Sequence, residues 1–236
     1  MKAFYAALVL YASGSLAFAS QTGDHNFVLI DRKKRSMSVV SESGKILVSC
    51  PVGIGRGPLK NKSNMQDCIT PVGEFFIDVV LSDNPRFNDI AMAQKSQIAK
   101  NARFARLVQD GDALAKVFRT MNEQDFNRDG IPDRAYGFAY FGLNGKNTGP
   151  KLIAAGPSAR WYAIALHGSP NEAKAIGGAT SEGCIHVSQS ILKRLLSEHL
   201  IGVGTRVHIN DGAESNVDVK RKSSVDDNEE LVRVLN

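Results

Sequence analysis

The sequence predicts a mainly β fold with some α-helix, and the spacing of its apolar residues carries that prediction. Segments with strand patterns, either alternating apolar positions or short apolar runs, recur along the chain: 26–52, 74–81, 136–141, 162–166 and 205–209. Helical spacing, with apolar residues three and four positions apart, occurs in two segments, 88–124 and 188–196. Strand segments lie on both sides of the longer helical segment, so we expect one mainly β domain with a helical insertion.

The N-terminus predicts export. Lys2 gives a short positive region, residues 3–12 are almost entirely apolar, and Ala17-Phe18-Ala19 fits a cleavage site. The apolar stretch is too short to span a bilayer comfortably, and no later segment reaches ~18 uninterrupted apolar residues. We therefore expect a signal peptide at 1–19 and no membrane span after its removal.

The first strands are expected within residues 26–52, where alternating apolar positions begin at Phe27 and again at Met37. Three glycines spaced two apart follow, between residues 53 and 57. This segment lacks the lysine/serine pair of a phosphate-binding loop and no helix opens after it, so a flexible loop is the favoured interpretation. The next strand is expected over 74–81.

A helical insertion of about residues 83–140 is predicted between the strand segments. Gly111 separates two short helices, whose apolar positions are Ile98, Ala102 and Ala105 in the first and Leu114, Val117, Phe118 and Met121 in the second. The insertion could form a lid over a cleft, or it could be an ornament of the domain.

Residues 125–133 carry closely spaced oxygen-bearing side chains. They occupy the first, third, fifth and ninth positions around a glycine turn: Asp125, Asn127, Asp129 and Asp133. A hard cation such as Ca²⁺ favours such oxygens, and the glycine permits the sharp bend. The bidentate acid of a standard EF-hand is missing, because Tyr136 stands at the twelfth position. A structural calcium site and a simple solvated turn are both compatible with this segment.

The C-terminal half completes the predicted domain. The runs at 136–141 and 162–166 are expected strands whose aromatic side chains enter the core. Ser188 can cap a helix whose apolar face is formed by Ile191, Leu192, Leu195 and Leu196, and a last strand follows at 205–209. Residues 212–236 are charged and polar, which predicts a disordered tail and a folded domain at 20–211.

The three cysteines, Cys50, Cys68 and Cys184, are an odd number for an exported protein. Oxidising compartments favour disulfides, so an odd count leaves one cysteine outside any intrachain pair. Cys50 and Cys68 lie near each other in sequence and could close a small loop. That hypothesis leaves Cys184 for other chemistry.

The segments His167-Gly168-Ser169 and Ser181-Glu182-Gly183-Cys184-Ile185-His186 hold the residues most suited to catalysis. A cysteine flanked by glycine can sit on a tight turn, with backbone N–H groups directed at a developing oxyanion. A histidine from a neighbouring strand can take the thiol proton, because the thiolate is the nucleophile. A small buried cysteine with a structural histidine is the alternative that this chemistry alone leaves open.

These segments resemble the signature of the L,D-transpeptidase catalytic-domain (YkuD-like) family, a histidine-glycine followed by serine-x-glycine-cysteine. The resemblance extends to three further segments: Thr70-Pro71-Val72-Gly73, Ile176-Gly177 and Gly204-Thr205-Arg206-Val207. It covers about residues 26–82 and 150–210. It implies a mainly β, sandwich-like catalytic domain with the cysteine in a cleft.

By this resemblance, Cys184 is the nucleophile, His167 is its base, and Gly168 supplies a backbone carbonyl that orients the imidazole. Backbone N–H groups around Gly183 and Cys184 would form the oxyanion site, and Ser181 would shape the turn.

Two positions depart from the family pattern. Glu182 stands where histidine is common, and His186 stands where arginine or asparagine is common. His186 can hold substrate or serve the structure, and the sequence favours neither role.

The resemblance implies transpeptidation of peptidoglycan tetrapeptide stems in the periplasm or cell wall, through a cysteine thioester, with D-alanine release and cross-link formation. It requires no cofactor. Hydrolysis at the same site, either of stems or of wall-linked protein, and a non-catalytic wall-binding module stay open. The formal net charge of +5 fits both an anionic wall and simple solubility. Nucleic-acid binding is not expected, since the folded part lacks a clustered basic face.

Overall fold

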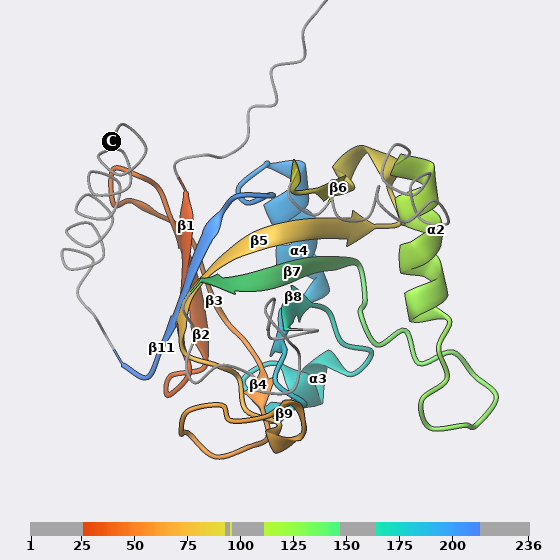
Figure 1. The fold of residues 1–236 in the computed structure, drawn as a ribbon, viewed down its shortest axis with the longest axis horizontal. Coiled ribbons are helices and arrows are strands. Elements are labelled where there is room, and N and C mark those ends of the chain that lie inside the picture. The colour runs from red at the N-terminus through yellow and green to blue at the C-terminus, as the bar shows by residue number, and fades with distance from the viewer. Residues whose placement is uncertain (1–25, 93–94, 96–110, 147–163, 213–236) are drawn as a thin grey trace, which may run out of the picture.

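The computed structural model of the protein describes residues 26–92, 95, 111–146 and 164–212 (Figure 1). The expected signal peptide at 1–19, the first helix of the insertion and nearly all of the expected tail lie outside these residues. In the part of the chain that is described, every helix is too short or too polar to cross a membrane.

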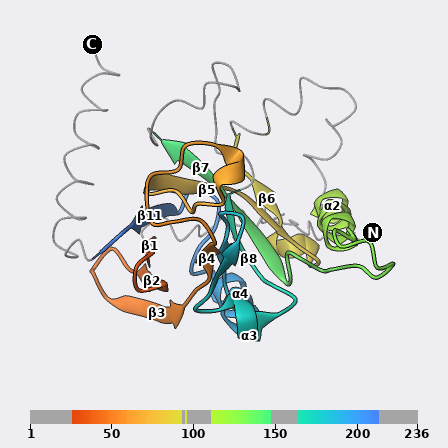
Figure 2. The same cartoon turned by 90° about the horizontal axis from the view of Figure 1, so that it is seen from below.

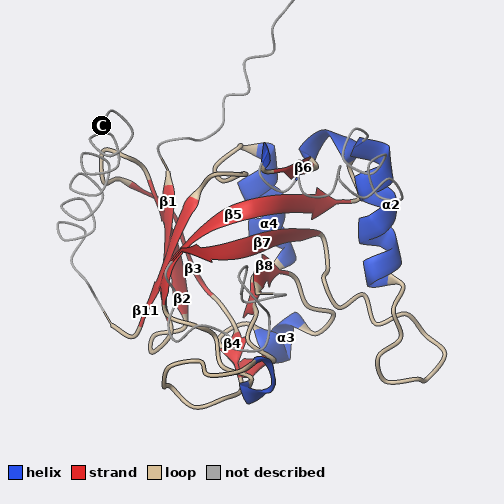
Figure 3. Cartoon of the chain, viewed as in Figure 1, coloured by secondary structure: helices blue, strands red, loops and turns tan. Residues whose placement is uncertain are grey.

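The fold is a curled, mixed β-sheet with few helices, as the sequence predicts (Figure 3). The strands of the described residues are β1 (Phe27–Asp31), β2 (Ser36–Val40), β3 (Ile46–Pro51), β4 (Ile54–Gly55), β5 (Gly73–Ser82), β6 (Asp89–Ile90), β7 (Ala139–Lys146), β8 (Ala165–His167), β9 (Ala179–Ser181), β10 (Ile185–His186) and β11 (Arg206–Asn210). The helices are α2 (Gly111–Asn122), α3 (Glu172–Ala175) and α4 (Gln189–Ser197), with 3₁₀ turns η1 (Met65–Asp67) and η2 (Pro85–Phe87).

Nine strands form one sheet in the order β10-β8-β7-β5-β11-β1-β2-β3, with β6 paired to β5, and β4 and β9 form a separate pair. In the large sheet, β1 with β11 and β8 with β10 are parallel, and the other neighbours are antiparallel. The last strand, β11, therefore lies between β1 and β5 and pairs with both. Figure 1 shows β1 running across the direction of β5 and β7, which is the curl of the sheet.

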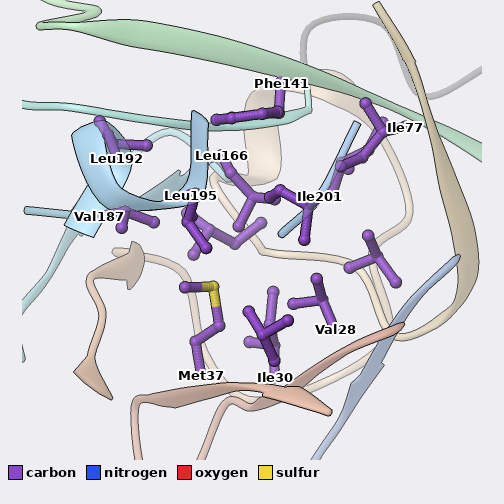
Figure 4. Packing of buried hydrophobic residues seen from close by; sticks show 14 of the residues in the cluster. Val28, Ile30, Met37, Ile77, Phe141, Leu166, Val187, Leu192, Leu195 and Ile201 are labelled. Carbon is purple, nitrogen blue, oxygen red and sulfur yellow. The ribbon is translucent and has the colours of Figure 1, made fainter. Parts of the chain in front are cut away.

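The main core lies between the two halves of the curled sheet and α4 (Figure 4). Val28 and Ile30 of β1 and Met37 of β2 are fully buried, in alternation with more exposed neighbours. Leu192 and Leu195 of α4 belong to the same core. Burying a side chain of this kind stabilises the fold by roughly 1.5–3 kcal/mol. The alternation that predicts the strands is therefore also what holds the sheet in its curl.

Most predicted elements of the described chain are confirmed, with shifted boundaries. β1, β2, β3, β5 and β11 fall where the apolar pattern puts them, and α4 buries three of its four predicted apolar residues. Ser188 precedes α4 as its N-cap, but its hydroxyl makes no capping bond. The strand expected at 136–141 begins at Ala139 and extends to Lys146. The residues before it turn, with Gly137 at a φ of +64°.

The prediction of a flexible loop at residues 53–57 is wrong. This segment contains β4, which pairs with β9. A Cβ on Gly55 would lie 2.1 Å from the carbonyl oxygen of Cys68, and one on Gly53 would lie 2.2 Å from that of Ala175. The glycines therefore serve close packing of backbone on backbone.

The described part of the insertion is less helical than predicted. Asp89–Ile90, expected within a helical segment, forms β6 against β5. Gly111 begins α2, whose Leu114 and Phe118 are buried. With Leu81 of β5 and the Ile90 side chain they form a second, smaller core.

The hypothesised Cys50–Cys68 disulfide is not formed, and all three cysteines are thiols in the structure. Cys50 packs against the main core from β3, and burial raises its pKa to about 11. The Cys68 thiol donates instead to the carbonyl oxygen of Gln66 at 3.4 Å. The two side chains thus lie in different surroundings, which their closeness in sequence does not reveal.

Arg32, at the end of β1, fastens the loop between β4 and β5 to the sheet. Its guanidinium donates to the Asp211 carboxylate and to the carbonyl oxygens of Lys60 and Thr70. Only 1% of Arg32 is exposed. Because a buried guanidinium must be paired, these contacts tie together segments that are far apart in sequence. Figures 1 and 2 show the loop, in orange, next to β4.

Replacing Arg32 with Met should destabilise the fold by about 3 kcal/mol, because Asp211 and two carbonyl oxygens lose their donor. Urea unfolding measures the loss. Lys34→Met is the matched control, since the Lys34 side chain is 66% exposed in its 3.5 Å pair with Asp31. That control should change stability by less than about 0.5 kcal/mol. Equal losses in the two variants would contradict the anchoring role.

Candidate active site

The parallel pair of β8 and β10 determines how His167 and Cys184 lie. Its register sets Ile185 opposite Leu166 and His186 opposite His167. Ile185 and Leu166 both belong to the main core. Side chains alternate between the two faces of a sheet, so the residues flanking this pair face away from the core. Cys184, immediately before Ile185, therefore shares a face with His167 and His186.

The His167 imidazole is buried and oriented by its own chain. Its Nδ1–H donates to the carbonyl oxygen of Gly168 at 2.7 Å, which leaves the lone pair of the neutral ring on Nε2. The rings of Tyr136 and His186 lie 5.1 Å away, and Tyr140 stacks at 6.3 Å. Burial, and then the nearby His186, lower the pKa of His167 to about 4, against the smaller, opposite effects of backbone hydrogen bonds with Gly168 and Ala135. The ring is thus neutral at neutral pH and able to accept a proton.

Cys184 sits on a tight turn between β9 and β10. Ser181 Oγ donates to the Cys184 carbonyl oxygen at 2.6 Å and accepts the Gly183 N–H at 3.1 Å. Gly183 has a φ of +128°, and a Cβ there would lie 2.9 Å from the carbonyl oxygen of Ile69. Both facts require glycine. The Gly183 N–H, expected to face an oxyanion, is bonded to Ser181 instead.

The thiol of Cys184 is protonated at rest. Burial raises its pKa to about 11, while a backbone hydrogen bond with Ala165 and the charge of Lys62 act to lower it. The carboxylate of Glu182 raises it further, although Glu182 is exposed and paired with Arg56 at 3.0 Å. A neutral thiol therefore accompanies a neutral imidazole, and proton transfer has to accompany nucleophilic attack.

His186 contacts the proposed base directly. Its backbone pairs with Gly53, and its ring meets His167 edge to face. Burial lowers the pKa of His186. Its Nδ1 is buried and finds no hydrogen-bond partner within the described residues. A buried ring nitrogen without a partner is uncommon, and it can meet a substrate group, one of the two roles that the sequence leaves open, when the ring turns.

Two tyrosines of the site were expected in the core on sequence alone. Tyr136 and Tyr140 flank His167, and the Tyr136 carbonyl oxygen accepts the Gly168 N–H at 2.8 Å. Burial, and then the charge that Cys184 can carry, raise the pKa of both phenols. Phe141, next to Tyr140, is in the main core. Because side chains alternate between the two faces of β7, the burial of Phe141 could have indicated that Tyr140 points away from the main core.

An open cavity of about 730 Å³ adjoins Tyr136 on the side of α2. It is lined by Ala113, Lys116, Val117, Thr120, Met121, Gln124, Phe126 and Tyr136. Because Tyr136 also packs against His167, this residue connects the insertion to the surface that carries the candidate base.

The predicted calcium loop forms a turn closed by its own side chains. Asp125 accepts three backbone N–H groups within the loop, Asp133 accepts one, and Asn127 donates to Asp129 and Asp133. Across the described ranges, no group of three or more His, Cys, Asp or Glu side chains is arranged to hold a metal. Calcium binding stays a prediction of the sequence.

A family model described as the L,D-transpeptidase catalytic domain matches residues 25–209. A search of curated proteins found no match.

Three solved structures illustrate the likeness. The structure of Bd1075 from Bdellovibrio bacteriovorus is 20% identical with a TM-score of 0.46, and the match covers 87% of this chain and 56% of that one. An L,D-transpeptidase from Xylanimonas cellulosilytica is 15% identical, with a TM-score of 0.39 and coverages of 79% and 60%. L,D-transpeptidase 1 of Mycobacterium tuberculosis is 14% identical with a TM-score of 0.35, and the match covers 78% of this chain and 61% of that one. The chain thus spans less than two thirds of these relatives.

Cys184 should react with iodoacetamide slowly at neutral pH, and its rate should rise with pH up to about 11. The raised pKa leaves only about one thiolate in 10⁴ at pH 7, and the thiolate is the nucleophile. Mass spectrometry of the Cys184 peptide over pH 6–11 gives the profile, with N-acetylcysteine as reference. An apparent pKa below 7 would mean a preformed thiolate–imidazolium pair and would contradict the neutral resting state.

Proposed function

This chain belongs to the L,D-transpeptidase catalytic-domain family, and we propose that it is an exported cysteine enzyme acting on the peptide stems of peptidoglycan. One observation supports the proposal most: in the register of β8 and β10, Cys184 and His167 share a face, and Gly168 orients the imidazole. A nucleophile near an oriented base is the arrangement that acyl transfer needs. The family supplies the substrate class, and the stems lie in the periplasm or cell wall.

In the first half-reaction, the donor is a tetrapeptide stem. His167 Nε2 accepts the thiol proton as the Cys184 sulfur attacks the carbonyl carbon of the third residue. The C–N bond to D-alanine then breaks, and His167 returns the proton to the leaving amine. A thioester on Cys184 remains, and none of these steps calls for a metal or another cofactor.

Groups on the same face suit the charge that develops in this step. The phenols of Tyr136 and Tyr140 stay protonated at neutral pH and can donate hydrogen bonds. His186 Nδ1 lacks a partner within the described residues. We assign these three side chains to holding the donor stem near His167, while an oxyanion role for the Cys184 N–H stays a prediction.

In the second half-reaction, the acceptor decides the product. A side-chain amine of a second stem gives a cross-link, and water gives a trimmed stem or a released wall-linked protein. The family to which the chain belongs supports transfer to an amine, and hydrolysis at the same site is the alternative. The oriented base argues against a module that only binds the wall.

Purified protein incubated with tetrapeptide muropeptides should release D-alanine and form cross-linked dimers, both seen by mass spectrometry. Cys184→Ala should give neither product, because no thioester can form. Trimmed monomers in place of dimers would replace transpeptidation by hydrolysis at the same site. Absence of any Cys184-dependent product, also with protein-linked stems, would point to a binding module.

His167→Gln should lower kcat by about 10²–10⁴, the range for loss of a general acid–base. The matched control is His199→Asn, because His199 is an exposed histidine at a φ of +50°, which asparagine tolerates. Steady-state D-alanine release measures both variants, and the control should keep full activity. A His167→Gln variant within threefold of the original protein would remove His167 as the base.

A further inference from the structure

We propose that Lys62 is a positioning residue for the reaction, whose buried ammonium, held by Asp67, stabilises negative charge on the Cys184 sulfur. The role deepens the proposed function and rests on it, since it concerns the same nucleophile. Its test uses thiol reactivity alone, so it can fail while transpeptidation stands.

The burial of Lys62 is the first observation. Lys62 lies in the loop between β4 and β5, and a lysine in a loop normally extends its ammonium group into water. Here Lys62 is 3% exposed, and Nζ lies 2.7 Å from Asp67 Oδ1. Taking an ammonium out of water costs several kcal/mol unless it is paired. A charge kept inside at that cost, next to a nucleophile, is a candidate for function.

The Asp67 carboxylate holds the loop in one conformation. Its Oδ2 accepts the backbone N–H groups of Ser63 and Asn64, and its Oδ1 accepts that of Ile69. Although burial alone would raise the pKa of Asp67, its bond with Lys62 and these backbone bonds hold it well below its usual range. The carboxylate is therefore charged at neutral pH, and the ammonium is fixed in place.

This loop lies against the turn that carries Cys184. Asp67 Oδ1 bonds both Lys62 Nζ and the Ile69 N–H, and the Ile69 carbonyl oxygen would be 2.9 Å from a Cβ on Gly183. Asp67 and Ile69 therefore connect the ammonium to the turn that carries Cys184. Its charge lowers the pKa of Cys184 against the larger, opposite effect of burial.

Apart from a backbone hydrogen bond with Ala165, which also lowers the pKa of Cys184, the other groups that face this cysteine do not supply this stabilisation. His167 and His186 have lowered pKa values and are neutral at neutral pH. Tyr136 and Tyr140 are neutral phenols. The charge of Glu182 acts in the opposite direction. Among the charged groups that act on Cys184 in the described chain, Lys62 is the one that favours the thiolate.

The test is the alkylation rate of Cys184 in the full chain over pH 7–9, read on the Cys184 peptide; this range lies well below the pKa of about 11, so the rate follows the thiolate fraction. Lys62→Met should make the thiolate about tenfold scarcer, which corresponds to about one unit of pKa. The remaining thiolate is intrinsically more nucleophilic, so the rate at pH 8 should fall about threefold. Lys62→Arg keeps the charge and should restore most of the rate. Lys60→Met, an exposed lysine of the same loop, should leave the profile unchanged.

Asp67→Asn tests the partner that fixes the ammonium. It leaves the lysine but removes the carboxylate that holds it, so the Cys184 rate at pH 8 should fall, by less than in Lys62→Met. A loss in Lys62→Arg as large as in Lys62→Met would show that the side chain acts through loop structure and not through its charge, and the proposal would be wrong. An unchanged rate in Lys62→Met, with unfolding curves showing a folded chain, would overturn it as well.

Discussion

The parallel pairing of β8 with β10 is the constraint on which the candidate site depends. Both strands are very short, so their backbone bonds alone specify little. Leu166 and Ile185 are fully buried, and a slip of β10 by one residue would turn Ile185 away from the core. The Val187 N–H extends the pairing by donating to the His167 carbonyl oxygen at 2.9 Å. Hydrophobic packing on one face thus sets which residues accompany Cys184 on the other.

The same packing sets the charge state of the site. Removing water disfavours the charged form of any group, which raises the pKa of a thiol and lowers that of an imidazole. Cys184 and His167 therefore move in opposite directions and remain neutral together. A neutral pair is protected from side reactions at rest, and it forms charge only when a substrate carbonyl is present. The surrounding hydrogen-bond donors and Lys62 therefore have to lower the free energy of forming that charge.

The sequence predicted the elements whose apolar residues recur at a regular spacing. β1, β5, β11 and α4 follow apolar periods of two or 3.6, and such periods report burial directly. His167 and Cys184 stand out by motif. Tyr136 and Lys62 do not, because their places depend on loops that meet only after the sheet has curled. The glycines at 53–57 show the same limit, since glycine serves both mobility and close approach, and only the partner backbone decides which.

The position of each charge near Cys184 determines how much it matters. Glu182 departs from the histidine common in the family and brings a negative charge next to the nucleophile, but it is exposed and paired with Arg56. Exposed charges are screened within about 10 Å at ordinary ionic strength, whereas buried ones are screened far less. Lys62 is buried, so its effect on the thiolate persists as salt rises while that of Glu182 fades. Because Arg32 holds the Lys60 and Thr70 carbonyl oxygens on either side of this lysine, the anchoring of a remote loop becomes part of the electrostatics of the nucleophile.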